Sequence, residues 1–257
     1  MARFWVGTSG WQYRDWRGRF YPKALPQKDW LAYYCEHFST VEINNSFYIE
    51  PSAKSWECWR ETAPEGFRYA VKAHGYLTHR KRLKDCDDSL ERVLRGATVL
   101  KSHLGPLLFQ LPPHFKRMEE HAARLEHFLA MLPLGLRCTF EFRDRSWFSE
   151  DTMEQLRRYG VAFCSYDKPD VKCPLAATAR FAYMRFHGPS ARYRGKYTDE
   201  MLEDWAERLR KLAENVDEAY CYFNNDAQAH AVTNAKTLAR LVDAAPTAVL
   251  ATGPGRT

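Results

Sequence analysis

Short segments in which polar and apolar residues alternate recur along the chain, separated by longer stretches whose apolar positions have helical spacing. At 139–143, Thr-Phe-Glu-Phe-Arg places three polar side chains on one face of an extended segment and two phenylalanines on the other. Alternation with a period of two is typical of a β-strand. Similar patterns occur at 41–44, 69–73 and 182–188. Several strands with one polar face each predict that their polar residues converge on a single site.

Eight extended segments are expected, and most are followed by a segment with helical periodicity. The strands are expected at 4–8, 41–44, 69–73, 107–111, 139–143, 161–165, 182–188 and 220–226. The helices are expected at 30–38, 52–62, from about 87, and at 119–132, 150–159, 199–215 and 227–244. This number of β/α units in about 245 residues predicts an α/β fold, a (β/α)₈ barrel of the TIM type. The irregular unit lies near 167–182, where no good helix is found.

A doubly wound open sheet is the alternative architecture, but no Gly-x-Gly-x-x-Gly motif follows any of the strands. Neither a linker nor a low-complexity stretch divides the chain. We therefore expect a single barrel domain at 1–245 and a loose tail at 246–257, which contains Gly and Pro without periodicity.

The composition favours a cytoplasmic protein. Hydrophobic residues make up 45% of the 257 residues, which is ample for a core. No apolar run reaches the length of a membrane span, and no secretory signal is found at the N-terminus. The seven cysteines are odd in number and form no Cys-x-x-Cys pair, which favours reduced thiols over disulfides or a zinc site. No membrane partner is expected, and the sequence does not indicate an oligomeric state.

Positive charge is concentrated in three short segments, at 11–21, 74–85 and 188–198. Together they carry more than the chain's net charge of +6, so the remainder is slightly acidic. The segments follow the first, third and seventh expected strands, and in a barrel they would surround one mouth. The sequence therefore predicts an electropositive mouth and a small anionic ligand.

Polar residues gather where the expected strands end, and in TIM-type barrels the carboxyl ends of the strands line the active site. The residues at these ends are Thr8, Glu42, Asn44, Lys72, Gln110, Glu141, Arg143, Asp167, Arg185, His187, Asn224 and Asp226. Burying so many charges for structure alone would be costly, so a functional site is expected. The alternative is a salt-bridged inner layer in which Glu and Arg neutralise each other.

Short motifs spread over the chain resemble those of one known family. They are GTSGW at 7–11, VEIN at 41–44, VKA at 71–73, LGPLLFQLPP at 104–113, EFRDRSWF at 141–148, RFHG at 185–188 and FNND at 223–226. In this order they are similar to the sequence blocks of the YecE-like family, also catalogued as domain of unknown function 72. The resemblance implies a TIM-type barrel, and it implies no established activity.

The leading hypothesis is an enzyme of hydrolase, lyase or isomerase type that acts on a small phosphate, carboxylate or sugar phosphate. Carboxylates and histidine are common general acids and bases, and the catalytic candidates are Glu42, Glu141, Asp167 and His187. Arginine and lysine bind phosphate and carboxylate groups. With the remaining polar residues of the set, they give the substrate-binding candidates Thr8, Asn44, Lys72, Gln110, Arg143, Arg185, Asn224 and Asp226.

Two variants of the enzyme hypothesis use the same carboxylates. A divalent metal could be held by Glu141, Asp167, His187 and Asp226, but two arginines in the same region would repel a cation, so a metal is not favoured. A glycoside hydrolase would use Glu42 and Glu141. These lie on the second and fifth strands and are expected to be nearly opposite each other, too far apart for a retaining mechanism.

The alternative from another class is a nucleic-acid-binding or nucleic-acid-processing protein. Its basic segments would hold phosphates, and interleaved aromatic residues would stack on bases. The aromatic candidates are Trp11, Tyr13, Trp16, Tyr193 and Tyr197. Exposed arginines that only solvate the loops are the simpler explanation of the charge.

Overall fold

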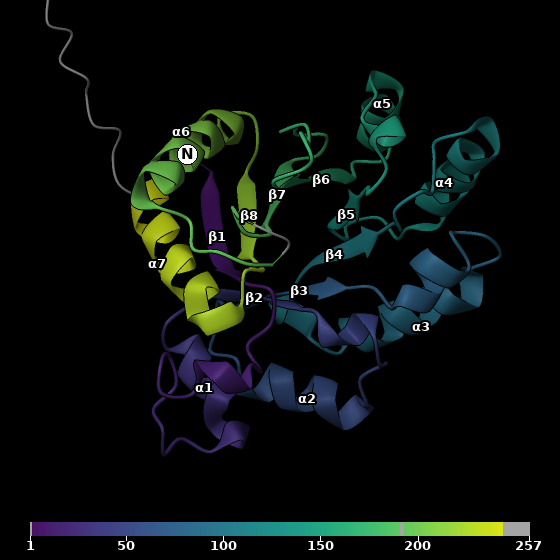
Figure 1. Ribbon diagram of the computed structural model, residues 1–257. Coiled ribbons are helices and arrows are strands. Elements are labelled where there is room, and N and C mark those ends of the chain that lie inside the picture. The colour runs from purple at the N-terminus through teal and green to yellow at the C-terminus, as the bar shows by residue number, and fades with distance from the viewer. Residues whose placement is uncertain (1, 191–192, 244–257) are drawn as a thin grey trace, which may run out of the picture.

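Eight parallel strands form one sheet that curves into a barrel, and α-helices surround it as an outer layer (Figure 1). The structure is a computed structural model that describes residues 2–190 and 193–243. The strands are β1 (Arg3–Thr8), β2 (Thr40–Ile43), β3 (Arg68–Lys72), β4 (Leu104–Gln110), β5 (Cys138–Glu141), β6 (Ala162–Asp167), β7 (Phe181–Phe186) and β8 (Glu218–Phe223). Their hydrogen-bonded order is β1-β8-β7-β6-β5-β4-β3-β2. The predicted TIM-type barrel is confirmed.

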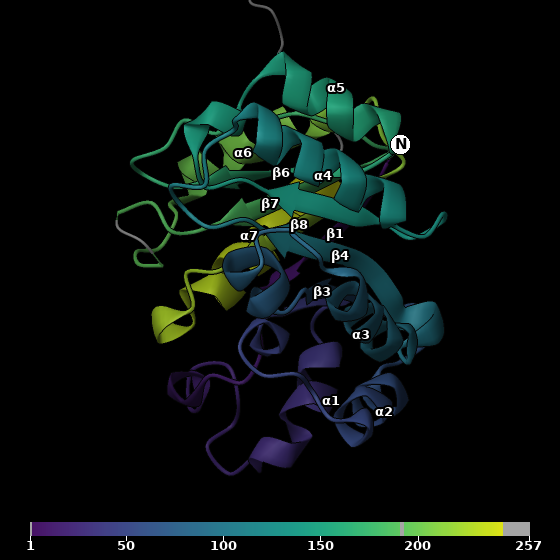
Figure 2. The same ribbon diagram turned by 90° about the vertical axis from the view of Figure 1, so that its right-hand side faces the viewer.

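The helices pack against the outside of the strands. Within the described residues they are α1 (Trp30–Cys35), α2 (Ala53–Thr62), α3 (Asp87–Thr98), α4 (Glu119–Met131), α5 (Glu150–Arg158), α6 (Asp199–Ala213) and α7 (His230–Asp243). The view in Figure 2 shows α4, α5 and α6 on one side of the strands and α1 and α2 on the other. No helix in the described part of the chain combines the length and the apolar character that a membrane crossing needs.

The barrel closes between β1 and β2. One β-bridge joins Ser9 to Glu42 there, and the N–H group of Gly10 donates to the carbonyl oxygen of Glu42 at 2.8 Å. The strands approach so closely that a Cβ atom on Gly7 would overlap the carbonyl oxygen of Thr40. Only glycine fits such a backbone contact.

A tyrosine hydroxyl from α1 holds this junction. The buried hydroxyl of Tyr34 accepts a hydrogen bond from the N–H group of Thr8 in β1 at 3.0 Å. It also bonds to the carbonyl oxygen of Thr40 in β2 at 3.2 Å. Few backbone groups pair directly between the two strands, so the hydroxyl satisfies one group on each.

Alternation along the strands divides the core into an inner and an outer part. In β5, Phe140 packs outward against Phe109 and Phe128, whereas Glu141 points into the barrel. The inner cluster consists of Trp5, Ala70, Leu108, Ala162, Cys164, Phe181, Tyr183, Tyr220 and Tyr222. Because tyrosine supplies both a ring and a hydroxyl, this interior is able to hold polar groups as well as apolar ones.

The connection between β6 and β7 is irregular, as the sequence predicts. Residues 168–180 contain no helix, and one isolated bridge joins Lys168 to Val171. The predicted tail at 246–257 lies outside the described residues, and so does Arg192 of the third basic segment.

Candidate functional site

Arg185 lies at the centre of a buried network inside the barrel. Its side chain is 1% exposed. Its Nη2 donates to Glu42 Oε1 at 2.8 Å, and its Nη1 donates to Glu141 Oε2 at 2.6 Å. One guanidinium therefore bridges two carboxylates that come from strands far apart in the barrel.

Other side chains also donate hydrogen bonds to the two carboxylates. The hydroxyl of Tyr183 donates to Glu42 Oε2 at 2.7 Å, and Nε2 of Gln110 donates to Glu141 Oε1 at 2.9 Å. Arg143 forms a further ion pair with Glu141. Burial alone would raise the pKa of Glu141, but Arg143 and Arg185 outweigh it and hold that pKa well below its usual value. Glu141 is thus a fixed anion, and a proton transfer through it would have to break this network.

His187 lies next to the network and is fully buried. Its Nε2 is 2.9 Å from Nη2 of Arg143. A guanidinium only donates hydrogen bonds, so Nε2 is the acceptor in this contact. The other ring nitrogen, Nδ1, is 3.4 Å from Nδ2 of Asn224. Burial, with the two nearby arginines, lowers the pKa of His187 to about 3. His187 is therefore neutral at physiological pH, and the predicted proton shuttle would work against this environment.

Thr8 and Asp167 do not reach the barrel mouth, in contrast to the prediction. The Thr8 hydroxyl donates to the carbonyl oxygen of Gly10 at 2.7 Å and bonds to Tyr34. Asp167 Oδ2 accepts from the hydroxyl of Tyr197 at 2.7 Å, in the layer between strands and helices. Successive side chains of a strand alternate between its two faces, and both residues lie on the outward face of their strand.

A cavity of about 430 Å³ opens at the carboxyl end of the barrel. Four of the predicted substrate-binding residues line it, namely Asn44, Lys72, Asn224 and Asp226. Tyr13 and Tyr48 also line it, from the segments after β1 and β2. The Arg185 network is buried beside this cavity and contributes none of its lining residues.

Lys72, the last residue of β3, is the unusual group of this cavity. It is 5% exposed, and its ammonium lies 4.1 Å from the ring centroid of Phe47. No carboxylate of the described residues forms an ion pair with it. Burial, assisted by Arg185, lowers the pKa of Lys72 to about 7. A substantial fraction of Lys72 is therefore a neutral amine at physiological pH.

The cavity holds two further polar groups, Asn44 and Asp226. The side-chain oxygen of Asn44 is buried and has no hydrogen-bond partner in the described part of the chain. Burial is the main reason that the pKa of Asp226 is raised. A backbone hydrogen bond lowers this pKa, and the nearby carboxylate of Asp15 raises it further. A ligand with a donor near Asn44 would satisfy the first of these groups.

The sequence placed Lys72 in the site only as an anion-binding cation. Its environment as a buried amine depends on Phe47, which lies in a different segment of the chain and contacts Lys72 only in the folded protein. The available signal was the position of a lysine between Val71 and Ala73, in an otherwise apolar strand.

The four residues of the metal hypothesis do not converge. His187 Nε2 and Glu141 Oε1 are 3.8 Å apart, but Asp167 points outward and Asp226 lines the mouth cavity. Within residues 2–190 and 193–243, no three His, Cys, Asp or Glu side chains form a group that could hold a metal ion.

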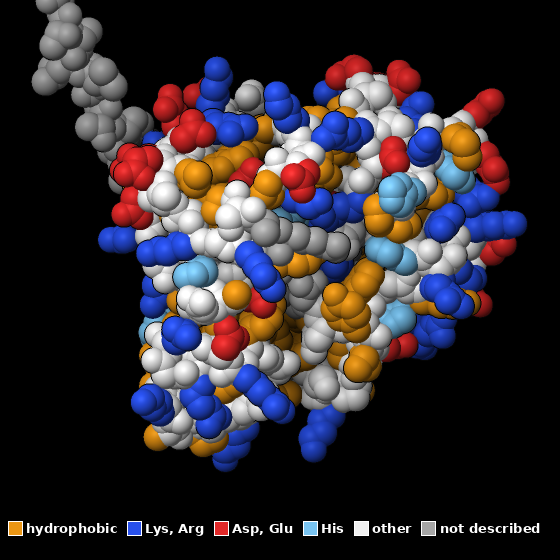
Figure 3. Space-filling model, in the orientation of Figure 1, with side chains coloured by type: hydrophobic (Ala, Val, Ile, Leu, Met, Phe, Trp, Pro, Cys, Tyr) orange, Lys and Arg blue, Asp and Glu red, His pale blue; other side chains and the backbone are white. Residues whose placement is uncertain are grey.

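The aromatic residues proposed for base stacking are mostly part of the core. Trp11 is 3% exposed, Trp16 is 0% exposed and Tyr197 is 1% exposed, so these three rings are not available for bases. Figure 3 shows Lys and Arg side chains spread among Asp and Glu over one face of the molecule rather than gathered in one patch. These observations do not favour a nucleic-acid surface.

Comparison with protein families identifies the relatives of this chain. A family model described as "Protein of unknown function DUF72" matches residues 5–257. The chain belongs to the DUF72 family. UPF0759 protein YunF of Bacillus subtilis is 30% identical over 93% of this chain and 94% of its own length. UPF0759 protein YecE of Escherichia coli is 31% identical over 51% of this chain and 47% of its own length.

Solved structures of DUF72 proteins have the same fold. The crystal structure of a DUF72 protein from Thermotoga maritima superposes with a TM-score of 0.86 at 31% identity, covering 94% of this chain and 100% of that one. A D-psicose 3-epimerase superposes with a TM-score of 0.53 at 11% identity, covering 86% of this chain and 92% of that one. The second likeness concerns the fold alone. The names of the DUF72 relatives state no reaction, so the site itself has to support a function.

Proposed function

We propose that this protein is an enzyme of lyase or isomerase type that moves a proton on a small anionic substrate at the barrel mouth. The observation that carries the proposal is Lys72, a buried amine that lines the mouth cavity without a carboxylate partner. An amine whose pKa is about 7 is suited to accept a proton at physiological pH and to return it. Asn44 and Asn224 line the same cavity and would orient the substrate beside it.

The charge balance of the site supports an anionic substrate. The buried network contains two carboxylates, Glu42 and Glu141, and two guanidiniums, Arg143 and Arg185, so it is formally neutral. When Lys72 is protonated, it adds a cation that no carboxylate of the described residues pairs with. A phosphate or carboxylate on the substrate would supply the missing charge and would raise the pKa of Lys72 in the complex.

Anion binding is the first test. Phosphate, sulfate and small dicarboxylates are titrated into the protein while the thermal midpoint is followed, since a ligand at one hundred times its Kd stabilises the native state by about 2.7 kcal/mol. At least one of these anions is expected to raise the midpoint of the wild type and to have little effect on Lys72→Met. Lys236→Met is the matched control, because Lys236 also lies over aromatic rings, Phe20 and Phe38, but far along the chain in α7. Equal shifts in wild type and Lys72→Met would contradict the proposal.

Proton transfer is the second test. Sugar phosphates and keto acids are incubated with the enzyme in D₂O, and incorporation of deuterium is followed by NMR. We expect exchange with the wild type and at least a hundredfold slower exchange with Lys72→Met, since general base catalysis contributes 10²- to 10⁴-fold. Exchange that persists at the wild-type rate in Lys72→Met would remove this residue from the mechanism.

Nucleic acid remains the alternative ligand for the basic loops, and it predicts different behaviour. A salt-dependent gel shift with single-stranded or duplex DNA or RNA would favour it. Absence of a shift, together with anion binding that depends on Lys72, would favour the enzyme.

A further inference from the structure

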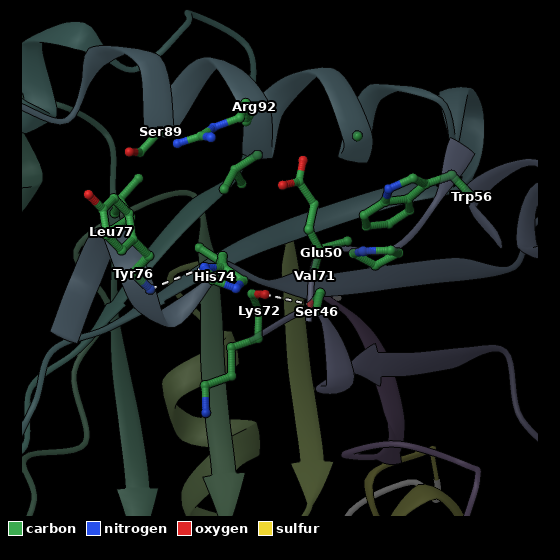
Figure 4. A pocket seen from close by; sticks show the side chains of 14 residues that line it. Ser46, Glu50, Trp56, Val71, Lys72, His74, Tyr76, Leu77, Ser89 and Arg92 are labelled. Atoms are coloured by element: carbon green, nitrogen blue, oxygen red, sulfur yellow. Dashed lines mark hydrogen bonds between the residues drawn. The ribbon is translucent and has the colours of Figure 1, made fainter. Parts of the chain in front are cut away.

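A second cavity, of about 300 Å³, lies beside the barrel between β3, α2 and α3 (Figure 4). Among the described residues, Lys72 is the only one that lines both this cavity and the mouth cavity. The carbonyl oxygen of Lys72 accepts a hydrogen bond from Ser46 Oγ at 2.7 Å in the wall of the second cavity, whereas its side chain leads away from this cavity, as Figure 4 shows. The two spaces are therefore distinct sites on opposite sides of one strand end.

The side chains at the base of the second cavity are apolar and buried. Trp56, Val71 and Leu77 line it and are 5%, 2% and 1% exposed. Gly96 of α3 makes room for the indole, since a Cβ atom there would lie 2.8 Å from Trp56 Nε1. A glycine inside a helix is less stable than an alanine there, so the position of the indole is maintained at the expense of helix stability.

A buried hydroxyl without a partner lies at one end of this cavity. Ser89, in the first turn of α3, is 5% exposed, and its Oγ has no hydrogen-bond partner in the described part of the chain. The helix has no side-chain cap at Cys86, so N–H groups of this turn also lack a side-chain acceptor. An unsatisfied buried hydroxyl is costly, and an acceptor on a ligand would remove that cost.

Arg92 adds a positive charge at the same end. It follows Ser89 by three residues and lies on the same face of α3, where both line the cavity. Figure 4 shows its guanidinium directed along the helix toward Ser89. Arg92 forms no ion pair within the described residues. The hydroxyl, the guanidinium and the positive end of the helix together suit a carboxylate.

Glu50 provides the opposite charge. It lines the cavity from the segment between β2 and α2, and Figure 4 shows its carboxylate rising toward α3. It pairs neither with Arg92 nor with any other cation of the described residues. The cavity thus presents one group for an anion and one for a cation above an apolar floor.

We propose that this cavity binds a small zwitterion of the α-amino acid class with an apolar side chain. Its carboxylate would bind Ser89 and Arg92, its ammonium group would bind Glu50, and its side chain would pack against Trp56. The volume is at the lower end of the range for ligand sites, which limits the ligand to about the size of one amino acid.

Calorimetric titration with L-phenylalanine and L-leucine tests this proposal. Two truncated probes are titrated in parallel: 3-phenylpropionate, which lacks the ammonium group, and phenethylamine, which lacks the carboxylate. We expect at least one amino acid to bind and both truncated probes to bind at least tenfold more weakly than L-phenylalanine. No binding of either amino acid at millimolar concentration would overturn the proposal, as would equal affinity of a truncated probe.

Variants assign the binding to this cavity. Arg92→Gln, Glu50→Gln and Ser89→Ala are each expected to weaken amino acid binding, the first two at least tenfold. Arg95→Gln is the matched control, because Arg95 is an exposed arginine of the same helix outside the cavity. Lys72→Met is expected to leave amino acid binding unchanged. A result that contradicts this proposal can therefore be told apart from one that contradicts the function proposed for the barrel mouth. Wild-type affinity in both Arg92→Gln and Glu50→Gln would also overturn the proposal.

Discussion

Two buried cations, Arg185 and Lys72, lie near each other in the barrel and differ in how they are compensated. Arg185 is held by Glu42 and Glu141, and its pKa stays well above the usual value because these carboxylates outweigh burial. Lys72 has only the face of Phe47 beside its ammonium. A cation–π contact offsets part of the desolvation of an ammonium but less than an ion pair does. Arg185 is therefore a permanent structural charge because it has two carboxylate partners, whereas Lys72 is a reactive amine because it has none.

The first prediction concerns the stability of Lys72→Met. The pKa of Lys72 falls from 10.5 in the unfolded chain to about 7 in the fold, so the unfolded state binds the proton more tightly. The cost of burying this lysine is therefore complete below pH 7 and is relieved as the pH rises toward 10.5. In urea unfolding, Lys72→Met should be more stable than the wild type at pH 6, and the difference should shrink steadily up to pH 10. A difference that does not change with pH would contradict the assignment.

The second prediction concerns the buried network. Glu141→Gln leaves Arg143 and Arg185 without one of their carboxylates in a buried setting, and breaking such a network typically costs about 3–5 kcal/mol of unfolding free energy. Glu120→Gln is the control, since Glu120 pairs with Arg124 on the exposed face of α4. Urea unfolding should show a large loss for the first variant and almost none for the second. Similar losses in both would mean that the network does not stabilise the fold.

For single residues, the sequence predicts which residues face the barrel interior better than it predicts which partners they contact there. The alternation around Glu141 and around Arg185 correctly placed both on inward faces. Thr8 and Asp167 were misplaced because a shift of one residue in a strand reverses the side on which a side chain lies. That Arg185 bridges two carboxylates depends on the register of strands that are distant in sequence, and no local pattern contains it.

At the scale of elements, the junction between β1 and β2 depends on one side chain of α1. The third prediction is that Tyr34→Phe lowers the unfolding free energy by about 1–3 kcal/mol, the cost of leaving buried polar groups unsatisfied. Both the N–H group of Thr8 and the carbonyl oxygen of Thr40 lose a partner in this variant.

Tyr159→Phe is the matched control for this variant. The hydroxyl of Tyr159 bonds to Glu126 at the protein surface, where water replaces it. Chemical denaturation of both variants should show a loss only for Tyr34→Phe. An unchanged midpoint for Tyr34→Phe would show that the strands hold each other without the hydroxyl.

The helices and strands could be predicted because the pattern of apolar and polar residues has a clear period in each strand and in most helices. The missing helix at 168–180 was foreseen for the same reason, since no period is present there. The close approach of β1 to β2 was not foreseen, because Gly7 in isolation could equally mark a turn.

For the molecule as a whole, the fourth prediction is a loss of stability in mild acid. The pKa of His187 is about 3 in the fold and near 6.5 in the unfolded chain, so stability falls as the pH drops from 6.5 toward 3. The pKa of Glu141 is held below 4.5, so its contribution is lost in turn as the pH falls below that value. Urea midpoints should decline from pH 7 to pH 4.

A His187→Gln variant separates the two contributions. Between pH 6.5 and 4.5 the change involves histidine rather than Glu141, so the decline in this window should become shallower in the variant. It should not vanish, because burial also lowers the pKa of His79, to about 4. A decline that is identical in wild type and variant would exclude His187 as its source.

The whole architecture followed from the count and spacing of strands, whereas the second cavity did not. Its lining comes from β3, α2, α3 and the segments beside them, and these residues form no motif in the sequence. Ser89 and Arg92 are ordinary helix residues until the fold places Trp56 and Glu50 opposite them.

The pairing of β1 with β8 has a consequence for the order in which the protein can assemble during synthesis. Six residues of β1, from Arg3 to Thr8, form a ladder with 218–223, but β1 shares only an isolated bridge with β2, its neighbour in sequence. As the chain leaves the ribosome, β1 therefore has no strong partner until nearly all of the barrel has been translated. A nascent chain that stops before residue 218 presents β1 with an unpaired edge, and such edges are templates for aggregation.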